Sequence, residues 1–490
     1  MVRVYNSNQV LDNCYYSCTN WTSKSKIEMI INKIHKNILI LGLGLSGLSL
    51  AKILKNKVRN LYCWDDSISV RKKITKTGLP IKSIENLDFR KLDYLVLSPA
   101  INHNSKEPHL AIKKAKKEKV RITTDIEFLK ILKIKNKIIG VTGTNGKSTT
   151  TKFIEQSLSD CKNKVFSCGN IGIPFGEVIK KVTSKDSLVV ETSSFQLDKI
   201  IDLKFDISIL LNLSKDHIDW HRNIRSYHKA KLKIFKNQGK NCFSIICIDD
   251  KNCKKIATNF SNNFKSKLIR ISTKEKLENG IYLTSNEKSI DIINTLNRTN
   301  IKIDRKKLGF TQAQHNFQNL LATYACFFVF KKSNESFKRS VSKLKNLEHR
   351  MEFVKKIKNI KIYNDSKATN INSSNNALIT LNNVYWILGG RKKPEGIKEV
   401  SSGLKNVRNA YTFGESKKEF NDFLKAKQIN SKECSTLKVA VNMAMKDGLK
   451  EKKEINLLFS PASSSFDQFK NFEHRGKAFK SLINEIIKND

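Results

Sequence analysis

The sequence lacks the cysteine spacing of a metal site or a disulfide framework. Its ten cysteines include no CxxC pair, because Cys14 and Cys18 are four residues apart and the others are isolated. Structural zinc sites and disulfide-rich domains use closely and regularly spaced cysteines. We therefore predict neither kind of framework.

Long apolar runs are also missing. The longest, residues 38–51, is too short and too glycine-rich to span a bilayer, and no apolar signal-peptide segment follows the first residue. We expect a cytoplasmic protein without membrane insertion. Residues 1–28 show no clear periodicity and Met29 is an alternative start. We therefore treat residues 1–35 as an N-terminal extension and expect it to be poorly ordered.

Acidic residues are scarce: 45 Asp and Glu stand against 91 Lys and Arg, a formal charge of +46. The lysines are scattered through every segment, together with many Asn and Ile, and they form no single basic stripe interleaved with aromatic residues. A codon bias toward AT explains these three residue types together, whereas charge alone indicates only solubility and non-specific attraction. We predict no nucleic-acid partner.

Apolar runs that end in Gly, Asp, Asn or Ser alternate with helix-like stretches along the chain. This order is typical of α/β units with parallel sheets, whose ligands bind beyond the carboxyl ends of the strands. The length of 490 residues suits two to four domains, and we place boundaries near residues 131 and 346. The predicted strands lie in residues 38–44, 60–66, 94–100, 137–143, 187–193, 208–214, 244–250, 361–367, 385–391, 410–416 and 455–462.

Two glycine-rich turns follow such strands. In the first, Gly42, Gly44 and Gly47 open a helix, and Asp65 closes the next predicted strand. This pattern is typical of a Rossmann-like turn that places a diphosphate at a helix N-terminus and a carboxylate near a ribose or base. The alternative is a purely structural turn.

The second turn, GVTGTNGKSTT at residues 140–150, departs from the GxxxxGK[ST] phosphate-loop pattern, because Val141 stands where the first glycine belongs. Its backbone amides would still cradle phosphates, while Lys147 would neutralise their oxygens and Ser148 would reach a magnesium ion. Glu191, at the end of a later predicted strand, is either a second acidic group for the metal or a surface carboxylate.

Two further residues are ambiguous by themselves. His217 follows Asp216 near a strand end, downstream of the phosphate loop, and is either a metal ligand or an ordinary histidine. Lys231 lies in a lysine-rich stretch, SYHKAKLKIF, and would by itself be interpreted as part of a solvated helix face.

The unusual loop and nine further blocks, in order along the chain, resemble the Mur ligase family. The blocks are GTNGKST (143–149), CGNIGIP (168–174), ETSSFQL (191–197), NLSKDHIDWH (212–221), YHKAKL (227–232), AQHNFQN (313–319), EHRME (348–352), NDSKATN (364–370), LGGRKK (388–393) and SPASSSFDQFKNFEHRG (460–476).

The resemblance implies three domains: a Rossmann-like domain for a UDP-sugar at 36–131, a central P-loop ATPase domain at 132–346 and a Rossmann-like domain for the amino acid at 347–490. It implies a monomeric ligase that uses ATP and Mg²⁺ in peptidoglycan synthesis, and thus in cell-wall growth, shape and division. The expected reaction adds D-glutamate to UDP-N-acetylmuramoyl-L-alanine through an acyl phosphate.

The resemblance also assigns site residues. For ATP these are Gly143, Thr144, Asn145, Gly146, Lys147, Ser148, Thr149, Asn316, His349, Arg350 and Asp365. For the UDP-sugar they are Gly44, Ser46, Asp65, Ser98, Asn170, Ser193 and Gln196, and for D-glutamate Thr369, Lys393, Ser465 and Phe472. The implied metal ligands are Ser148, Glu191, His217 and Lys231, the last as a carbamate, and Lys147, His217 and Lys231 are the expected catalytic residues.

Two departures from the family pattern are mild. Ala313 stands where glycine is usual, and Ser464 and Ser465 belong to a serine-rich loop that often contains cysteine. No residue is assigned as the general base for the incoming amine. Alternatives are a sibling ligase for another amino acid, a folylpolyglutamate synthase-like enzyme, a Rossmann oxidoreductase and a nucleic-acid-binding ATPase. The last two leave GTNGKST or NDSKATN unexplained.

Overall fold

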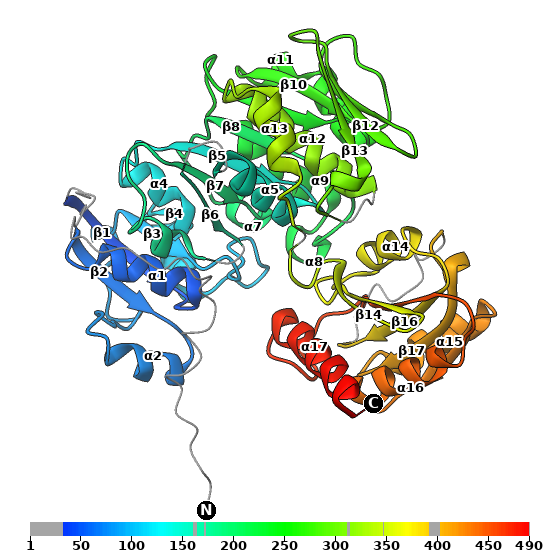
Figure 1. Ribbon diagram of the computed structural model, residues 1–490. Coiled ribbons are helices and arrows are strands. Elements are labelled where there is room, and N and C mark those ends of the chain that lie inside the picture. The colour runs from blue at the N-terminus through cyan, green and yellow to red at the C-terminus, as the bar shows by residue number, and fades with distance from the viewer. Residues whose placement is uncertain are drawn as a thin grey trace, which may run out of the picture.

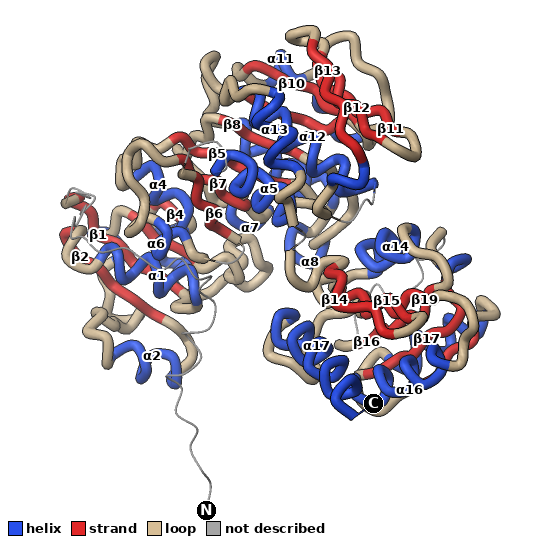
Figure 2. The backbone as a smooth tube through the Cα atoms, viewed as in Figure 1, coloured by secondary structure: helices blue, strands red, loops and turns tan. Residues whose placement is uncertain are grey.

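The computed structural model describes residues 33–159, 164–170, 173–310, 314–345, 347–391 and 402–489. The predictions for residues 1–32, Ala313 and Lys393 lie outside these described residues, whereas a strand already begins at Ile34, within the predicted extension 1–35. The chain forms three units, each built around a largely parallel sheet with helices (Figure 1, Figure 2). This confirms the predicted α/β class, and every apolar run predicted as a strand forms one.

The first unit holds a four-stranded parallel sheet in the order β2-β1-β3-β4. Its elements are β1 (Ile34–Leu41), α1 (Leu45–Leu54), β2 (Val58–Trp64), α2 (Ile68–Thr75), η1 (Phe89–Lys91), β3 (Tyr94–Leu97), α3 (Leu110–Lys117), β4 (Arg121–Thr123), η2 (Asp125–Glu127) and α4 (Phe128–Ile131).

The central unit holds nine strands in the order β13-β12-β11-β10-β9-β8-β5-β7-β6, antiparallel only at β11, β12 and β13. Its strands are β5 (Lys137–Thr142), β6 (Val165–Gly169), β7 (Ser187–Glu191), β8 (Ile207–Leu210), β9 (Phe243–Cys247), β10 (Lys267–Ser272), β11 (Ile281–Ser285), β12 (Ser289–Asn294) and β13 (Thr299–Asp304). Its helices are α5 (Lys147–Ser159), α6 (Phe175–Val178), α7 (Ser194–Leu197), α8 (Ile218–His221), α9 (Ile224–Leu232), η3 (Lys233–Phe235), α10 (Lys251–Thr258), α11 (Phe260–Asn263), η4 (Arg305–Lys307), α12 (Gln314–Val329) and α13 (Asn334–Val341).

The C-terminal unit holds six strands in the order β14-β15-β19-β16-β17-β18, with only β14 antiparallel to its neighbour. Figure 1 shows it as a separate lobe, coloured yellow to red. Its elements are β14 (Glu352–Ile357), β15 (Ile360–Asn364), α14 (Ile371–Ile379), β16 (Val384–Gly389), η5 (Leu404–Asn406), β17 (Val407–Phe413), α15 (Lys417–Ala426), β18 (Asn430–Glu433), α16 (Leu437–Leu449), β19 (Ile455–Phe459) and α17 (Phe472–Asn489).

β16 illustrates why the apolar runs become internal parallel strands. All six of its residues are buried. Trp386 and Leu388 belong to one apolar cluster, whereas Tyr385 and Ile387 belong to another. A strand packed on both faces needs this continuous apolar sequence, because neither side of the pleat meets water.

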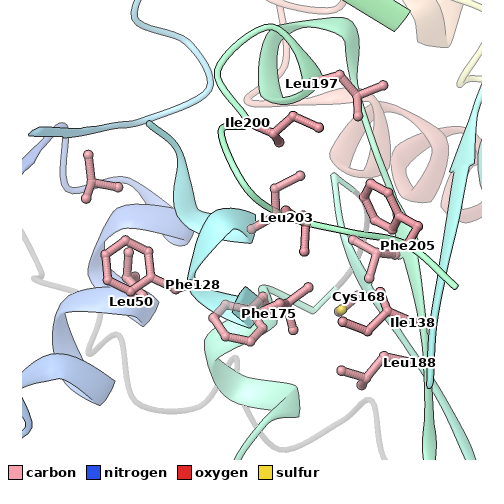
Figure 3. Close-up of a cluster of buried hydrophobic side chains, with 14 of the residues drawn as sticks. Leu50, Phe128, Ile138, Cys168, Phe175, Leu188, Leu197, Ile200, Leu203 and Phe205 are labelled. Atoms are coloured by element: carbon pink, nitrogen blue, oxygen red, sulfur yellow. The ribbon is translucent and has the colours of Figure 1, made fainter. Parts of the chain in front are cut away.

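The first and central units share one apolar cluster. It runs from Leu50 of α1 and Phe128 of α4 to Phe175 of α6 and Phe205, all of which are buried (Figure 3). The two clusters of the C-terminal unit draw instead on residues from 351 onward. The predicted domain boundaries stay predictions, with strands of different sheets on either side of each.

Gly176 lets α6 approach α1 closely in this shared core. A Cβ atom at Gly176 would come 2.7 Å from the backbone oxygen of Ser49 and 2.9 Å from Cδ1 of Ile53.

Within the described part of the chain, no helix combines the length and apolar character needed to cross a membrane.

We predict that Gly176→Ala lowers the free energy of unfolding by about 1–3 kcal/mol, because the added methyl group overpacks the contact between the units. Urea unfolding of the whole chain measures this change. Gly239→Ala is the matched control, since a Cβ there would meet no atom within 4 Å. Equal stability of the two variants would contradict the close contact.

Candidate functional site

The phosphate loop joins β5 to α5. Gly143 and Gly146 have φ angles of +156° and +85°, which residues with side chains rarely adopt. Gly140 has a different role, because a Cβ there would lie 2.7 Å from the ring of Phe205. Gly140, which precedes Val141, is therefore a packing residue of β5, and the loop proper begins at Gly143.

Lys147 lies at the start of α5 and folds back over the loop. Its Nζ donates to the carbonyl oxygens of Gly143 and Thr144, at 2.9 and 2.7 Å. Burial lowers the pKa of Lys147, and the Glu191 carboxylate partly opposes this shift. The neighbouring Ser148 is buried, and its Oγ accepts a hydrogen bond from Nη2 of Arg350 at 3.3 Å. The C-terminal segment thus reaches the phosphate loop directly.

Glu191 ends β7 beside this loop and is 1% exposed, so the surface-carboxylate alternative is wrong. Its Oε1 accepts a hydrogen bond from Nδ2 of Asn170 at 3.3 Å, whereas its Oε2 is buried without a hydrogen-bond partner among the described residues. A buried carboxylate oxygen needs a proton donor or a cation. The oxygens of Glu191 and Ser148 therefore fit a magnesium ion.

The other two predicted metal ligands differ in exposure. Lys231 of α9 is 2% exposed and its Nζ donates to the carbonyl oxygen of Gly143 at 2.8 Å. Burial, aided by the charge of Lys147, holds the pKa of Lys231 well below its usual value. The solvated-face interpretation of Lys231 is thus wrong. His217 is half-exposed and has a left-handed φ of 51°, with its ring 4.7 Å from that of Phe195.

Across the described ranges, no group of three or more His, Cys, Asp or Glu side chains is arranged to hold a metal ion.

Two of the residues assigned to the nucleotide from the C-terminal side, His349 and Asp365, are buried. Nδ1 of His349 lies 2.9 Å from Nδ2 of Asn364. Asp365 accepts hydrogen bonds from the Met351 amide at 3.1 Å and the Ser460 hydroxyl at 2.8 Å. Burial raises the pKa of Asp365 to about 7. This carboxyl group is therefore protonated more readily near neutral pH than a solvent-exposed aspartate.

One cavity of about 240 Å³ joins the two sides. The central unit contributes the loop, α12 and the segment after β8, and the C-terminal unit contributes the segment before α14. Of the predicted residues, those lining it are Thr144, Asn145, Gly146, Thr149, His217, Asn316, Arg350, Asp365 and Thr369.

The predicted D-glutamate residues are only partly gathered. Thr369 lines the cavity. Phe472 begins α17, and its carbonyl oxygen accepts a hydrogen bond from Oγ of Ser366 at 2.9 Å. Ser465 is buried in the loop after β19, outside the residues that line the cavity.

The predicted UDP-sugar residues surround the other glycine turn and α7. Both oxygens of Asp65 accept backbone amides, from Leu43 at 2.7 Å and Ser67 at 3.0 Å, so Asp65 holds the turn in shape. Gly44 caps α1 next to Ser46, and Ser98 follows β3 with its amide bonded to Leu41.

Gln196 is fully buried. Its amide forms a capping box with Ser193 and donates to Oδ1 of Asp125 at 3.1 Å, which ties the central unit to the first. The direct contact of Gln196 with substrate stays a prediction.

Sequence reasoning missed three residues. Lys367 lines the cavity with its Nζ 4.7 Å from the ring centre of Phe472, and burial lowers its pKa to about 7. Arg475 is fully buried and donates to the carbonyl oxygens of Ser366 and Ser463, so it fixes two loops at once. The Asn212 side chain forms two hydrogen bonds with the backbone of Asn145 in the phosphate loop. Each lies inside a quoted block, NDSKATN, FEHRG or NLSKDHIDWH, and this position was the available signal.

Comparison with known proteins agrees with this geometry. Residues 141–327 match the model of the Mur ligase middle domain, and residues 349–460 match that of the Mur ligase glutamate ligase domain. Among solved structures, MurF ligase from Thermotoga maritima in complex with ADP has a TM-score of 0.57 at 16% identity, covering 94% of this chain and 99% of that chain. MurC (TM0231) from the same organism has a TM-score of 0.56 at 17% identity, covering 92% and 100%. At these identities the likeness shows the fold alone.

Sequence relatives are nearer. A protein of Rickettsia bellii (strain RML369-C) is 37% identical over 462 residues, covering 92% of this chain and 99% of its own length. One of Wolbachia pipientis wMel is 31% identical, covering 94% and 98%. The chain therefore belongs to the Mur ligase family. Both relatives bear the name UDP-N-acetylmuramoylalanine--D-glutamate ligase.

We predict that Lys147→Ala lowers ATP turnover at least about a hundredfold, because a buried cation is lost where phosphate charge must be held. Phosphate release measures turnover, and the melting temperature shows that the fold is kept. Lys152→Ala is the matched control, since Lys152 lies on the same helix with its side chain 41% exposed and paired to Glu155. Near-normal turnover of the Lys147 variant would remove the loop from the ATP site.

Proposed function

We propose that this chain is an ATP-dependent, ADP-forming ligase that adds D-glutamate to UDP-N-acetylmuramoyl-L-alanine in peptidoglycan synthesis. The observation that carries the proposal is that one cavity is lined both by the phosphate loop and by Asp365, Lys367 and Thr369. A phosphate donor and an amino acid held on these two walls would meet there. The names of relatives at 31–37% identity over more than nine-tenths of the chain support the substrate.

The chemistry explains why a ligase needs such a cavity. A free carboxylate is a poor electrophile, so the alanine carboxylate first attacks the γ-phosphorus of ATP, and ADP leaves. The amine of D-glutamate then attacks the acyl carbon, and phosphate leaves from the tetrahedral intermediate. Both steps develop negative charge on oxygen, which the buried cations Lys147 and Arg350 stabilise without prior reorganisation.

The unit roles follow the predicted division of the chain. Residues 36–131 hold the UDP-sugar with Gly44, Ser46, Asp65 and Ser98, and residues 132–346 add Asn170, Ser193 and Gln196. Residues 347–490 bring the amino acid through Thr369, Lys393, Ser465 and Phe472. ATP takes the loop 143–149 together with Asn316, His349, Arg350 and Asp365. The protein acts as a cytoplasmic monomer.

Magnesium would be held by Ser148, Glu191 and His217, and it would screen the charge of the phosphate groups. The orphan oxygen of Glu191 is the observation that favours this ion. Asn170 holds the other oxygen of Glu191 and thereby fixes the direction of the carboxylate.

Lys231 is carbamylated in this proposal. Its buried environment favours the neutral amine, which is the form that attacks carbon dioxide. A new N–C bond forms, one proton leaves the nitrogen of the neutral amine, and the group becomes an anion; starting from the ammonium form, two protons leave in all. This change also removes the repulsion between Lys231 and Lys147 and adds a metal ligand beside Glu191.

The decisive experiment measures phosphate release by the purified protein with ATP, Mg²⁺ and UDP-N-acetylmuramoyl-L-alanine. We expect sustained release with D-glutamate and none with L-glutamate, L-alanine or no amino acid. Release with a different amino acid would indicate a sibling ligase. Release indifferent to all of them would contradict the ligase proposal and favour a simple ATPase.

We predict that Lys231→Ala loses ligase activity and regains part of it with a short-chain carboxylic acid, which occupies the space of the carbamate and restores the anion. Initial rates at rising acetate concentration measure the rescue. Lys229→Ala, an exposed lysine on the same helix, is the control and should keep its rate without acetate. Full activity of Lys231→Ala without acetate would exclude Lys231 from the site.

A further inference from the structure

The segment that follows β8 lies against the phosphate loop and forms hydrogen bonds with it. The side-chain amide of Asn212 binds both polar groups of Asn145, because Oδ1 accepts from the Asn145 amide at 2.8 Å and Nδ2 donates to the Asn145 carbonyl at 3.2 Å. The Thr144 amide also donates to the backbone oxygen of Asn212 at 2.9 Å. Three hydrogen bonds therefore fix two successive residues of the loop.

Asn212 is itself held in one orientation. Its Nδ2 also donates to Oε1 of Gln318 on α12 at 2.9 Å, and Nε2 of Gln318 donates to the sulfur of Cys247 at 2.8 Å. Burial keeps the pKa of Cys247 well above its usual value, so the sulfur remains a neutral thiol. An amide NH₂ group has two hydrogens. Both are directed here, one to Asn145 and one to Gln318, and a flipped amide would lose all of these bonds.

The loop needs such support because its own sequence does not supply it. The usual pattern has a glycine where Val141 stands, and the loop turns at Gly143 and Gly146, both at positive φ. Glycines widen the range of backbone shapes open to a loop. A loop held in its binding shape before the ligand arrives does not lose conformational freedom on binding, and this strengthens affinity.

We infer that Asn212, oriented by Gln318, is a positioning residue that holds the phosphate loop in its nucleotide-binding shape. The Asn145 amide is turned toward Asn212, which leaves the first turn of the 13-residue helix α5 to face the phosphates. Asn212 and Gln318 also line the cavity, so the grip and the ligand share one wall. This inference rests on the proposed use of ATP by the loop.

The test is the binding of MgADP to the whole chain, measured by calorimetry without UDP-sugar or glutamate. We expect Asn212→Ala to weaken binding about tenfold, since about two net hydrogen bonds are lost. Gln318→Leu keeps Asn212 but frees its amide, and it should weaken binding about threefold. Because Gln318 acts through Asn212, the double variant should bind no more weakly than Asn212→Ala alone.

One control variant and one replacement variant separate the positioning role from an effect on overall stability. Asn252→Ala removes an amide hydrogen bond of 3.1 Å to the neighbouring carbonyl of Leu213 and leaves the grip on Asn145 intact, so its affinity should be unchanged. Asn212→Asp keeps the acceptor for the Asn145 amide and loses both donors, and it serves if the alanine variant does not fold.

Each outcome decides the matter. Wild-type affinity in the Asn212 variants, or losses that simply add in the double variant, would overturn the positioning role while leaving the ATP site in place. Failure of the wild type itself to bind MgADP would instead overturn the proposed function on which the inference rests.

Discussion

The site depends on cations held close together. Lys147, Lys231 and Arg350 all interact electrostatically with Glu191, with Asp216 or Asp365 as a further carboxylate, and burial lowers the pKa of each of the three cations. Buried charges without partners are costly. The close packing of these cations is therefore unfavourable without bound anions, and the phosphates of a nucleotide would neutralise them.

The connections between units differ in strength, and this sets which parts can move. The first two units share an apolar core and are joined at Gln196, Glu127 and Arg121 by hydrogen bonds and an ion pair. The C-terminal unit has its own clusters and reaches the phosphate loop through Arg350. Motion that brings the amino acid to the acyl phosphate is thus assigned to the C-terminal unit, because moving it leaves the shared core intact.

Sequence patterns predicted the internal strands and the phosphate loop well, because both depend on local chemistry. Short aromatic and aliphatic runs followed by glycine, such as that of β16, favour buried strands, and GK[ST] after a strand is typical of a phosphate loop. The internal strand β10 and the antiparallel strands β11, β12 and β13 were missed although they end in Ser, Asn or Asp, because polar residues interrupt their apolar residues. The burial of Lys231 could not be seen either. Lys229 on the same helix is exposed, whereas Lys231 packs against the carbonyl oxygen of Gly143 and is removed from water.

Gln196 and Asp65 show a similar limit. Their residue types and positions suggested substrate contacts, yet both side chains bind the protein's own backbone or neighbouring side chains. A polar residue at a strand end can serve a ligand or can build the wall that serves it, and the sequence does not separate these uses. Lys367 shows the reverse case, because it lies inside the NDSKATN block without an assigned role although it lines the cavity.

The shared core has a further consequence for how enzymes of this shape can be divided and recombined. Division of the chain near residue 131 would expose Leu50, Phe128 and Phe175 to solvent on two fragments, which would then tend to aggregate. Division near residue 346 separates no apolar cluster. Exchange of parts between relatives is therefore easiest at the second junction. The C-terminal unit can be exchanged as a module, whereas the first and central units must be kept together.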